Sequence, residues 1–250
     1  MNPQEYERMR ALEDWYWWFV ARREAALRFL DDYAPKRNTL RVLDAGCGTG
    51  ALLDDLARRP HTEAVGVDVS PEALALTRAR GAAKRLVGGD LTRLPLAENR
   101  FDAVTALDVL EHVQDDRAAA AEIARALRPG GVLVVSVPAY RFLWSAHDVA
   151  LHHQRRYVAG ELRRVLEDAG LEIVRLTYLL TLLLPIAVAV RWSQRLLRRG
   201  EAKANLVEVC PTINRCLIAL QRAELGWATR VSLPFGVSIL AVARKPGAQR

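Results

Sequence analysis

The sequence has few cysteines and no apolar run long enough to span a membrane. Three cysteines in 250 residues cannot build a disulfide framework, and Cys210 and Cys216 alone are too few to hold zinc. We therefore expect a reducing compartment, the cytoplasm. The uncharged run at 176–190 is interrupted by Pro185, and a bilayer-spanning helix needs about 20 apolar residues.

Internal repeats, low-complexity segments and a dense basic tract are also missing. The first residues, MNPQEYERMR, have no apolar core, so we expect no signal peptide. Apolar residues make up 51% of the chain and charged residues 26%, a balance typical of a globular domain. The formal net charge of +7 reflects dispersed surface arginines or, alternatively, suits an anionic partner such as a lipid surface or a nucleic acid.

Glycines are concentrated in one short segment, Val42-Leu43-Asp44-Ala45-Gly46-Cys47-Gly48-Thr49-Gly50. Apolar residues before it predict a buried strand, and apolar residues at helical spacing after it predict a helix. Glycine lets the backbone turn sharply and approach a ligand closely, and the start of a helix suits an anionic group. The segment matches the dinucleotide pattern G-x-G-x-x-A, but other ligand classes share such loops, so the rest of the chain must decide.

Strand and helix patterns alternate from residue 40 onward. This alternation predicts a doubly wound α/β fold with a mostly parallel sheet, whose ligands bind at the carboxyl ends of the strands. Ser70 and Pro71 are suited to begin a helix, and Gly170 is suited to end one. The predicted strands are 40–43, 64–67, about 85–87, 101–107, 132–137, 171–178 and 237–243, and the predicted helices are 51–58, from 71, about 117–127 and 161–169.

Three segments flank this pattern. Residues 4–33 predict one long helix whose aromatic run, Trp15 to Phe19, either packs on the core or forms a lid over a substrate. Residues 139–157 predict a loop rich in histidine and arginine. Residues 179–226 predict helices with breaks at Pro185 and around Gly200 and Pro211. The run at 176–190 is a core helix, a wall of an apolar pocket or an interfacial helix followed by basic residues at 191, 195, 198 and 199.

Five stretches carry a family resemblance: VLDAGCGTG, VGVDVS, GGDLTRLPL, FDAVTALDVLEHV and LRPGGVLVVSVP. In this order they resemble class I S-adenosylmethionine (SAM) methyltransferases of the small-molecule type 11/12 group, over about residues 38–178. The resemblance implies a Rossmann-like sheet of seven strands with the last one antiparallel. The segments WWF-x-ARR and HHQRRY further resemble bacterial enzymes linked to cell-surface polysaccharide or lipid modification.

The resemblance also implies the domain organisation. We expect a single methyltransferase domain over 1–250, built from an N-terminal helical cap segment (1–37), a SAM-binding core (38–178), a helical insert (179–230) and the last strand with its tail (231–250). The N-terminal helix and the insert together would form a cap over the site.

SAM is the cofactor that the resemblance implies. In the family, an acid after the second strand binds the ribose, here Asp68, and an acid after the third binds the adenine, here Asp90, with the backbone of Leu91. Asp44 would fix the methionine end, and Leu107 would lie near the sulfonium. The expected cofactor-binding residues are Asp44, Gly46, Gly48, Gly50, Asp68, Val69, Asp90, Leu91 and Leu107.

A hydroxyl acceptor needs a general base, because it must lose its proton during the transfer. Histidine titrates near neutrality, and the loop after the fifth strand is rich in it. The candidate catalytic residues are His147, Asp148 and His152, with His112 and His153 also nearby. A metal is not expected. Asp108-x-x-Glu111-His112 nevertheless resembles the E-x-x-E-H metal motif of ubiquinone O-methyltransferases and small-RNA 3′-end methyltransferases, which makes these three residues the candidate ligands.

We interpret the chain as a methyltransferase acting on a small, bulky, partly apolar acceptor, such as a lipid-linked sugar, an isoprenoid or a secondary metabolite. O-methylation is favoured, with C-methylation of an isoprenoid-type acceptor as an alternative. A nucleic-acid methyltransferase is disfavoured, since neither an RNA-binding module nor an N-P-P-Y signature is present. A non-catalytic SAM-binding protein that docks at a membrane is the other alternative. We expect a cytoplasmic protein with possible peripheral contact at the inner membrane face.

Overall fold

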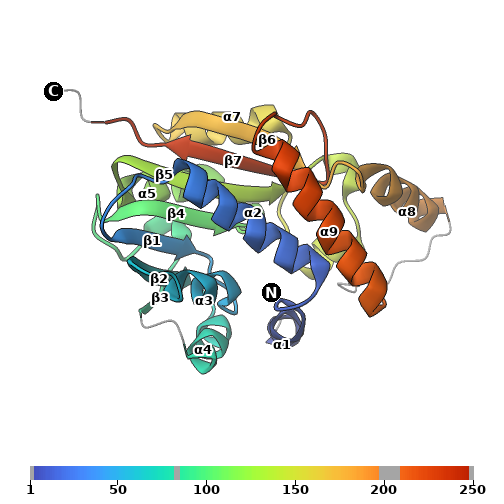
Figure 1. Ribbon diagram of the computed structural model, residues 1–250, viewed down its shortest axis with the longest axis horizontal. Coiled ribbons are helices and arrows are strands. Elements are labelled where there is room, and N and C mark those ends of the chain that lie inside the picture. Colours follow the sequence, from blue (N-terminus) through green and yellow to red (C-terminus); the bar gives the residue numbers. More distant parts are fainter. Residues whose placement is uncertain (1–2, 82–84, 197–208, 248–250) are drawn as a thin grey trace.

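The computed structural model describes residues 3–81, 85–196 and 209–247. Strands and helices alternate through the central part of the chain, as the sequence predicts (Figure 1). The strands are β1 (Leu40–Ala45), β2 (Thr62–Asp68), β3 (Leu86–Gly88), β4 (Phe101–Leu107), β5 (Leu127–Pro138), β6 (Glu172–Leu179) and β7 (Ser238–Arg244). The α-helices are α1 (Pro3–Leu12), α2 (Trp17–Tyr33), α3 (Ala51–Ala57), α4 (Pro71–Arg80), α5 (Asp116–Ala126), α6 (Ala146–Ala150), α7 (Ala159–Asp168), α8 (Leu184–Leu196) and α9 (Pro211–Ala228). Three short 3₁₀ turns are η1 (Leu91–Arg93), η2 (Leu110–His112) and η3 (Arg141–Leu143).

The described strands form one seven-stranded sheet in the order β3-β2-β1-β4-β5-β7-β6. All pairings from β3 to β5 are parallel, whereas β7 is antiparallel to both β5 and β6. The fold prediction of a mostly parallel Rossmann-like sheet with an antiparallel last strand is therefore confirmed. The strand order reverses between β1 and β4, and ligands of such sheets bind at that point.

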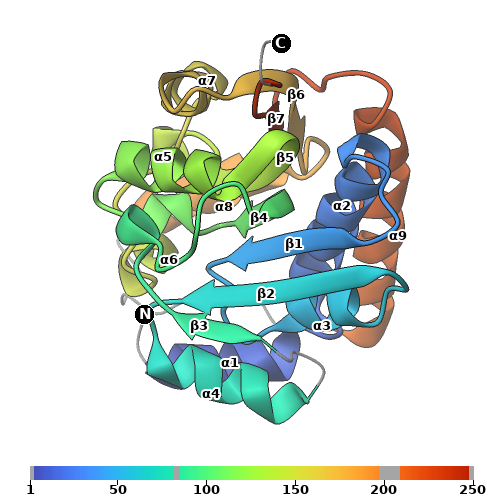
Figure 2. The same cartoon turned by 90° about the vertical axis from the view of Figure 1, so that its left-hand side faces the viewer.

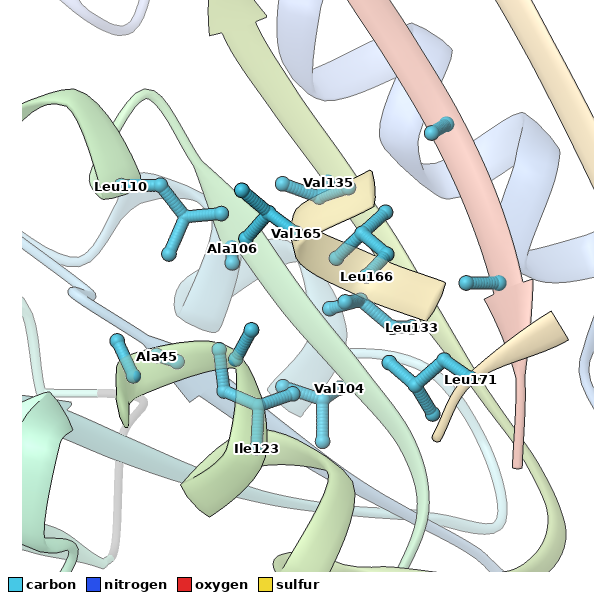
Figure 3. Packing of buried hydrophobic residues seen from close by; sticks show 14 of the residues in the cluster. Ala45, Val104, Ala106, Leu110, Ile123, Leu133, Val135, Val165, Leu166 and Leu171 are labelled. Atoms are coloured by element: carbon cyan, nitrogen blue, oxygen red, sulfur yellow. The ribbon is translucent and has the colours of Figure 1, made fainter. Parts of the chain in front are cut away.

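Two apolar clusters cover the two faces of the sheet. Successive residues of a strand point to opposite faces, so Val42 joins the cluster under α2 and α3, while Leu43 joins the cluster under α5 and α7. Figure 2 shows α2 and α9 on one side of the sheet and α5 and α7 on the other. Figure 3 shows how Ile123 of α5 and Leu166 of α7 pack against the strand residues Val104 and Leu133. These clusters hold the strand ends that carry the site.

The prediction of one long helix over residues 4–33 is wrong. The chain forms α1 and α2, separated by a turn at residues 13–16. The aromatic run lies across this break, where the Tyr16 side chain is buried and Trp15 is exposed. A run of aromatic residues gave no sign of a turn, because helix-breaking glycine and proline are absent from it.

Two further segments differ from expectation in detail. The predicted loop at 139–157 contains η3 and α6, the latter capped by Ser145, whose backbone N–H donates a 2.9 Å hydrogen bond to Asp148. The predicted helical segment at 179–226 contains α8 and α9, but its first residues belong to β6 and a turn. Pro185 lies in the first turn of α8, where the backbone N–H that proline lacks would have no hydrogen-bond partner within the helix. The predicted break around Gly200 lies outside the described residues.

The N-terminal helix pair and α9 contact each other through Asn214. Figure 1 shows α2 and α9 side by side across one face of the sheet. Arg222 of α9 also forms an ion pair with Glu24 of α2, with a closest distance of 2.6 Å. Among the described helices, none combines the length and the apolarity needed to cross a bilayer.

Candidate functional site

The glycine loop after β1 forms the floor of the site. Gly46, Gly48 and Gly50 have φ values of +74°, +55° and +87°, a region that side chains other than glycine rarely adopt. A Cβ atom on Gly46 would lie 2.4 Å from Val109, and one on Gly48 would lie 3.0 Å from Met9. Glycine at these positions therefore allows the backbone to turn and lets Val109 and Met9 pack closely against the loop.

Asp68, the last residue of β2, fixes this loop. One carboxylate oxygen accepts a hydrogen bond from the backbone N–H of Gly48 at 2.9 Å, and the other accepts one from Ser70 at 2.9 Å. Asp44 lies beside the loop at the end of β1 and accepts a 2.8 Å hydrogen bond from the Thr105 hydroxyl. Burial raises the pKa of Asp44 to about 7, although the Thr105 hydrogen bond opposes the shift. Burial also raises the pKa of Asp68.

Asp90 follows β3 at the same edge of the sheet. Its side chain is exposed and caps η1 by accepting a 2.8 Å hydrogen bond from the Thr92 N–H. Leu91, the next residue, is buried. The acids predicted from the sequence thus lie at successive strand ends around one cavity, with Asp44 and Asp68 closest to the glycine loop.

This cavity has a volume of about 1300 Å³. Pockets for a single small ligand are typically ~300–1,000 Å³, so the cavity has room for a cofactor and a second molecule. Gly50 and Asp148 do not line it. The other predicted site residues do line it: Asp44, Gly46, Gly48, Asp68, Val69, Asp90, Leu91, Leu107, Asp108, Glu111, His112, His147 and His152.

The N-terminal helix α1 closes the cavity over the glycine loop, and sequence reasoning did not find its residues. Tyr6 and Met9 line the cavity. Glu13 is buried and accepts a 2.6 Å hydrogen bond from the Thr49 hydroxyl. The same carboxylate is paired with Arg80 of α4 at 2.5 Å. A charged residue gives no sequence signal of burial, because its partners lie 36 and 67 residues away.

Asp108 begins the segment after β4, where its backbone has a φ of +49°. It is paired with Arg22 of α2 and accepts a 2.8 Å hydrogen bond from Ser136. Burial would raise the pKa of Asp108, but Arg22 and Ser136 outweigh it and lower the pKa. This pairing connects the N-terminal helix α2 to the end of β4.

The candidate metal group differs from the predicted one. Glu111, His112 and His153 each place one ligand atom within 4.8 Å of the others, whereas Asp108 is engaged by Arg22. Both carboxylate oxygens of Glu111 are buried and have no hydrogen-bond partner. Burial and the Asp108 charge raise the pKa of Glu111 well above its usual value. An imidazole–carboxylate set of this kind suits Zn²⁺ or Mn²⁺. The expectation from the sequence that no metal is bound stays a prediction.

The candidate bases have different environments. His147 is partly buried, and burial lowers its pKa to about 4. His152 is exposed and has a φ of +59°. Asp148 is fully buried and accepts hydrogen bonds from two nitrogens of Arg156, at 2.7 and 3.1 Å. His153 Nδ1 lies 3.0 Å from the same carboxylate, and the side chain of His153 lines the cavity.

Comparisons with known proteins agree on the family. Residues 43–135 match a family described as a methyltransferase domain. A probable S-adenosylmethionine-dependent methyltransferase of Mycolicibacterium smegmatis is 38% identical over 137 residues, which are 53% of this chain and 52% of that protein. A malonyl-[acyl-carrier protein] O-methyltransferase of Enterobacter lignolyticus is 32% identical over 200 residues, 77% of this chain and 76% of that protein. The chain thus spans about half the length of the first relative and three quarters of the second.

Solved structures share the fold. A chain from the complex between the Haloferax volcanii Trm112 methyltransferase activator and the putative methyltransferase has a TM-score of 0.66 at 22% identity, over 99% of this chain and 96% of that chain. A Haemonchus contortus phosphoethanolamine N-methyltransferase 2, solved with S-adenosyl-L-methionine, has a TM-score of 0.59 at 18% identity, over 89% of this chain and 52% of that one.

Proposed function

Because this chain belongs to the class I SAM-dependent methyltransferase family, with SAM as its cofactor, we propose that it transfers a methyl group to a hydroxyl of a bulky, partly apolar small molecule. The observation that carries the proposal is a cavity of about 1300 Å³ that is lined both by the loop glycines and strand-end acids and by apolar side chains of α2, α8 and α9. The alternative of non-catalytic SAM binding is an outcome of the test below.

The glycine loop and the strand-end acids would hold the cofactor. Gly46 and Gly48 of the loop line the cavity, where a glycine backbone can approach a ligand closely. Asp68 would face the ribose hydroxyls and Asp90 the adenine, while Asp44 would pair with the amino group of the methionine end. SAM supplies a methyl group on a positively charged sulfur.

His153 is the residue that we assign as general base. The Asp148 carboxylate holds Nδ1 of His153 at 3.0 Å, and Arg156 holds Asp148 in turn. A carboxylate at Nδ1 fixes the tautomer that leaves Nε2 free to accept a proton. The acceptor hydroxyl would give its proton to His153 Nε2 as its oxygen bonds to the methyl carbon and the carbon–sulfur bond breaks. Asp148, proposed from the sequence as a base, would act as the positioning residue.

The acceptor would occupy the apolar end of the cavity. The lining there comes from Trp17 and Trp18 of α2, from Leu217 of α9 and from Leu183 and Ile186 near α8. Such a lining binds hydrocarbon or aromatic groups and excludes water from the transfer. We place the reaction in the cytoplasm at the inner membrane face.

The test measures S-adenosylhomocysteine formed by the wild type with phenols, prenyl diphosphates and sugar lipids as acceptors. His153→Gln is expected to lower kcat by about 10²-fold or more, with unchanged SAM affinity by calorimetry. His147→Gln and His152→Gln are matched controls in the same loop and should retain most activity. Turnover by His153→Gln at the wild-type rate would overturn the base assignment. SAM binding without turnover on any acceptor would favour the non-catalytic alternative.

A further inference from the structure

Helix α8 has an apolar outer surface that no described segment covers. Its sequence, LPIAVAVRWSQRL, contains two arginines and no acidic residue. Among its described side chains, the exposed ones are all uncharged: Pro185, Ile186, Ala189, Val190, Trp192 and Ser193. A surface helix normally turns charged residues outward, and a helix that is apolar on its outer side is covered by something.

The exposed residues of α8 continue into neighbouring segments. Leu182, just before the helix, is 57% exposed, and Ile186 and Trp192 on the helix are 60% and 61% exposed. The Thr181 hydroxyl donates a 2.6 Å hydrogen bond to the backbone oxygen of Phe235, which places the exposed Phe235 beside Leu182. We call Leu182, Ile186, Val190, Trp192 and Phe235 the α8 patch. Large apolar side chains gathered on one exposed helix and its neighbouring segment are typical of a binding surface.

The α8 patch lies at the mouth of the cavity. Ile186 and Val190 belong to the patch and also line the cavity. Figure 1 shows α8 beyond the carboxyl ends of the parallel strands. A molecule that covers the patch therefore also lies against the entrance for the acceptor.

We propose that the α8 patch docks into the surface of an anionic lipid bilayer, so that an acceptor with an apolar chain enters the cavity directly from the membrane. This inference rests on the proposed function, since it specifies the acceptor as a membrane lipid. The net charge of +7 favours this occupant over a second copy of the chain, because a cationic protein is attracted to an anionic leaflet and repelled by its own copies. Trp192 fits the same arrangement, since tryptophan side chains are enriched at the boundary of a bilayer. The arginines at 198 and 199 lie outside the described residues.

The experiment is flotation of the full chain with vesicles of phosphatidylcholine alone or mixed with phosphatidylglycerol. The wild type should float with the mixed vesicles and less with the neutral ones. Leu182→Glu and Trp192→Glu should each lower the bound fraction about tenfold or more, because both charges would enter the apolar layer. Val174→Glu is the matched control. Val174 is exposed near the start of β6, at the opposite end of that strand from α8, and its substitution should leave flotation unchanged.

A second measurement avoids introduced charges. Brominated acyl chains should quench the fluorescence of the wild type, and Trp192→Phe should remove part of that quenching. SAM titration by calorimetry separates the two proposals: failure to bind SAM overturns the proposed function, whereas SAM binding without flotation overturns only the docking surface. Flotation of both glutamate variants at the wild-type level would also overturn it. So would a dimer by light scattering that Leu182→Glu dissociates, since the patch would then be a contact between copies.

Discussion

The Asn214 side chain joins α9 to the turn before α2: Oδ1 accepts a hydrogen bond from the Trp17 N–H at 2.8 Å, and Nδ2 donates one to the Trp15 carbonyl at 2.8 Å. Asn214 lies 197 residues after Trp17. The oxygen and the nitrogen of one side-chain amide thus both hold α9 against the turn before α2. Because Trp17 lines the cavity, this contact sets the shape of the site as well as the stability of the helix pair.

We expect Asn214→Ala to lower the free energy of unfolding by about 1–3 kcal/mol, since it leaves two backbone groups without partners in a half-buried position. Urea denaturation measures the change. Asn38→Ala, at an exposed position before β1, is the control and should have little effect. An Asn214→Ala protein as stable as this control would show that the two hydrogen bonds are replaced by water.

A substitution at Gly50 tests whether the loop conformation requires glycine. The φ of +87° at Gly50 and a Cβ contact of 2.6 Å with Thr77 both oppose a side chain there. Gly50→Ala should therefore lower the free energy of unfolding by about 1–3 kcal/mol. Gly160→Ala is the opposite case, since Gly160 lies in α7 with no atom near its Cβ position. It should stabilise the protein by about 0.4–1 kcal/mol. Equal effects of the two substitutions would contradict this reading of the loop.

The pKa of Asp44 predicts a pH dependence of SAM binding. The carboxyl group is mostly protonated below its pKa of about 7 in the folded protein. The cationic methionine end of the cofactor favours the carboxylate, so binding releases a proton below that pH. SAM affinity should therefore rise by up to about tenfold per pH unit from about pH 5 to about pH 7 and level off above. Asp44→Asn should bind more weakly and lose most of this slope, measured by calorimetry. An unchanged slope in Asp44→Asn would assign the proton elsewhere.

The sequence was sufficient for the sheet and the cofactor end of the site, because both depend on short-range patterns. The strand at 40–43 and the loop ending at Gly50 are specified within a few residues, and Ser70 caps its own helix. The contacts of the segments predicted to form the cap could not be predicted in the same way. These contacts join residues far apart in the chain, as in Glu13 with Arg80 or Trp17 with Asn214. Nothing in the sequence distinguishes His153 from His147 and His152 in the same loop. The role proposed for His153 depends on its contact with the Asp148 carboxylate, which only the structure gives.

The Glu111 side chain is either a buried protonated acid or a metal ligand, and the two states predict different effects on stability. Its pKa is raised in the folded protein by burial and by the Asp108 charge. When the pKa of an acid is higher in the folded protein than in the unfolded chain, the protein loses stability as the pH rises above the unfolded pKa, which is about 4.3 for glutamate. Without metal, Glu111→Gln should therefore be more stable than the wild type at about pH 8, with the advantage shrinking towards about pH 4, by urea denaturation at each pH.

Addition of Mn²⁺ or Zn²⁺ separates the two readings of Glu111. If the carboxylate binds a cation with His112 and His153, the metal should raise the melting temperature of the wild type and not that of Glu111→Gln. An equal response of both proteins would exclude Glu111 as a ligand.

The position of β7 in the sheet imposes an order on biosynthesis. Among the described strands, β6 pairs only with β7, and β7 lies between β5 and β6. A ribosome must therefore translate through residue 244 before the strand at 172–179 can be incorporated. Until then the nascent polypeptide carries an open edge along β5, to which another chain could add. The half of the sheet that contains the glycine loop can therefore form during translation, whereas β6 joins the sheet only after β7 has been synthesised.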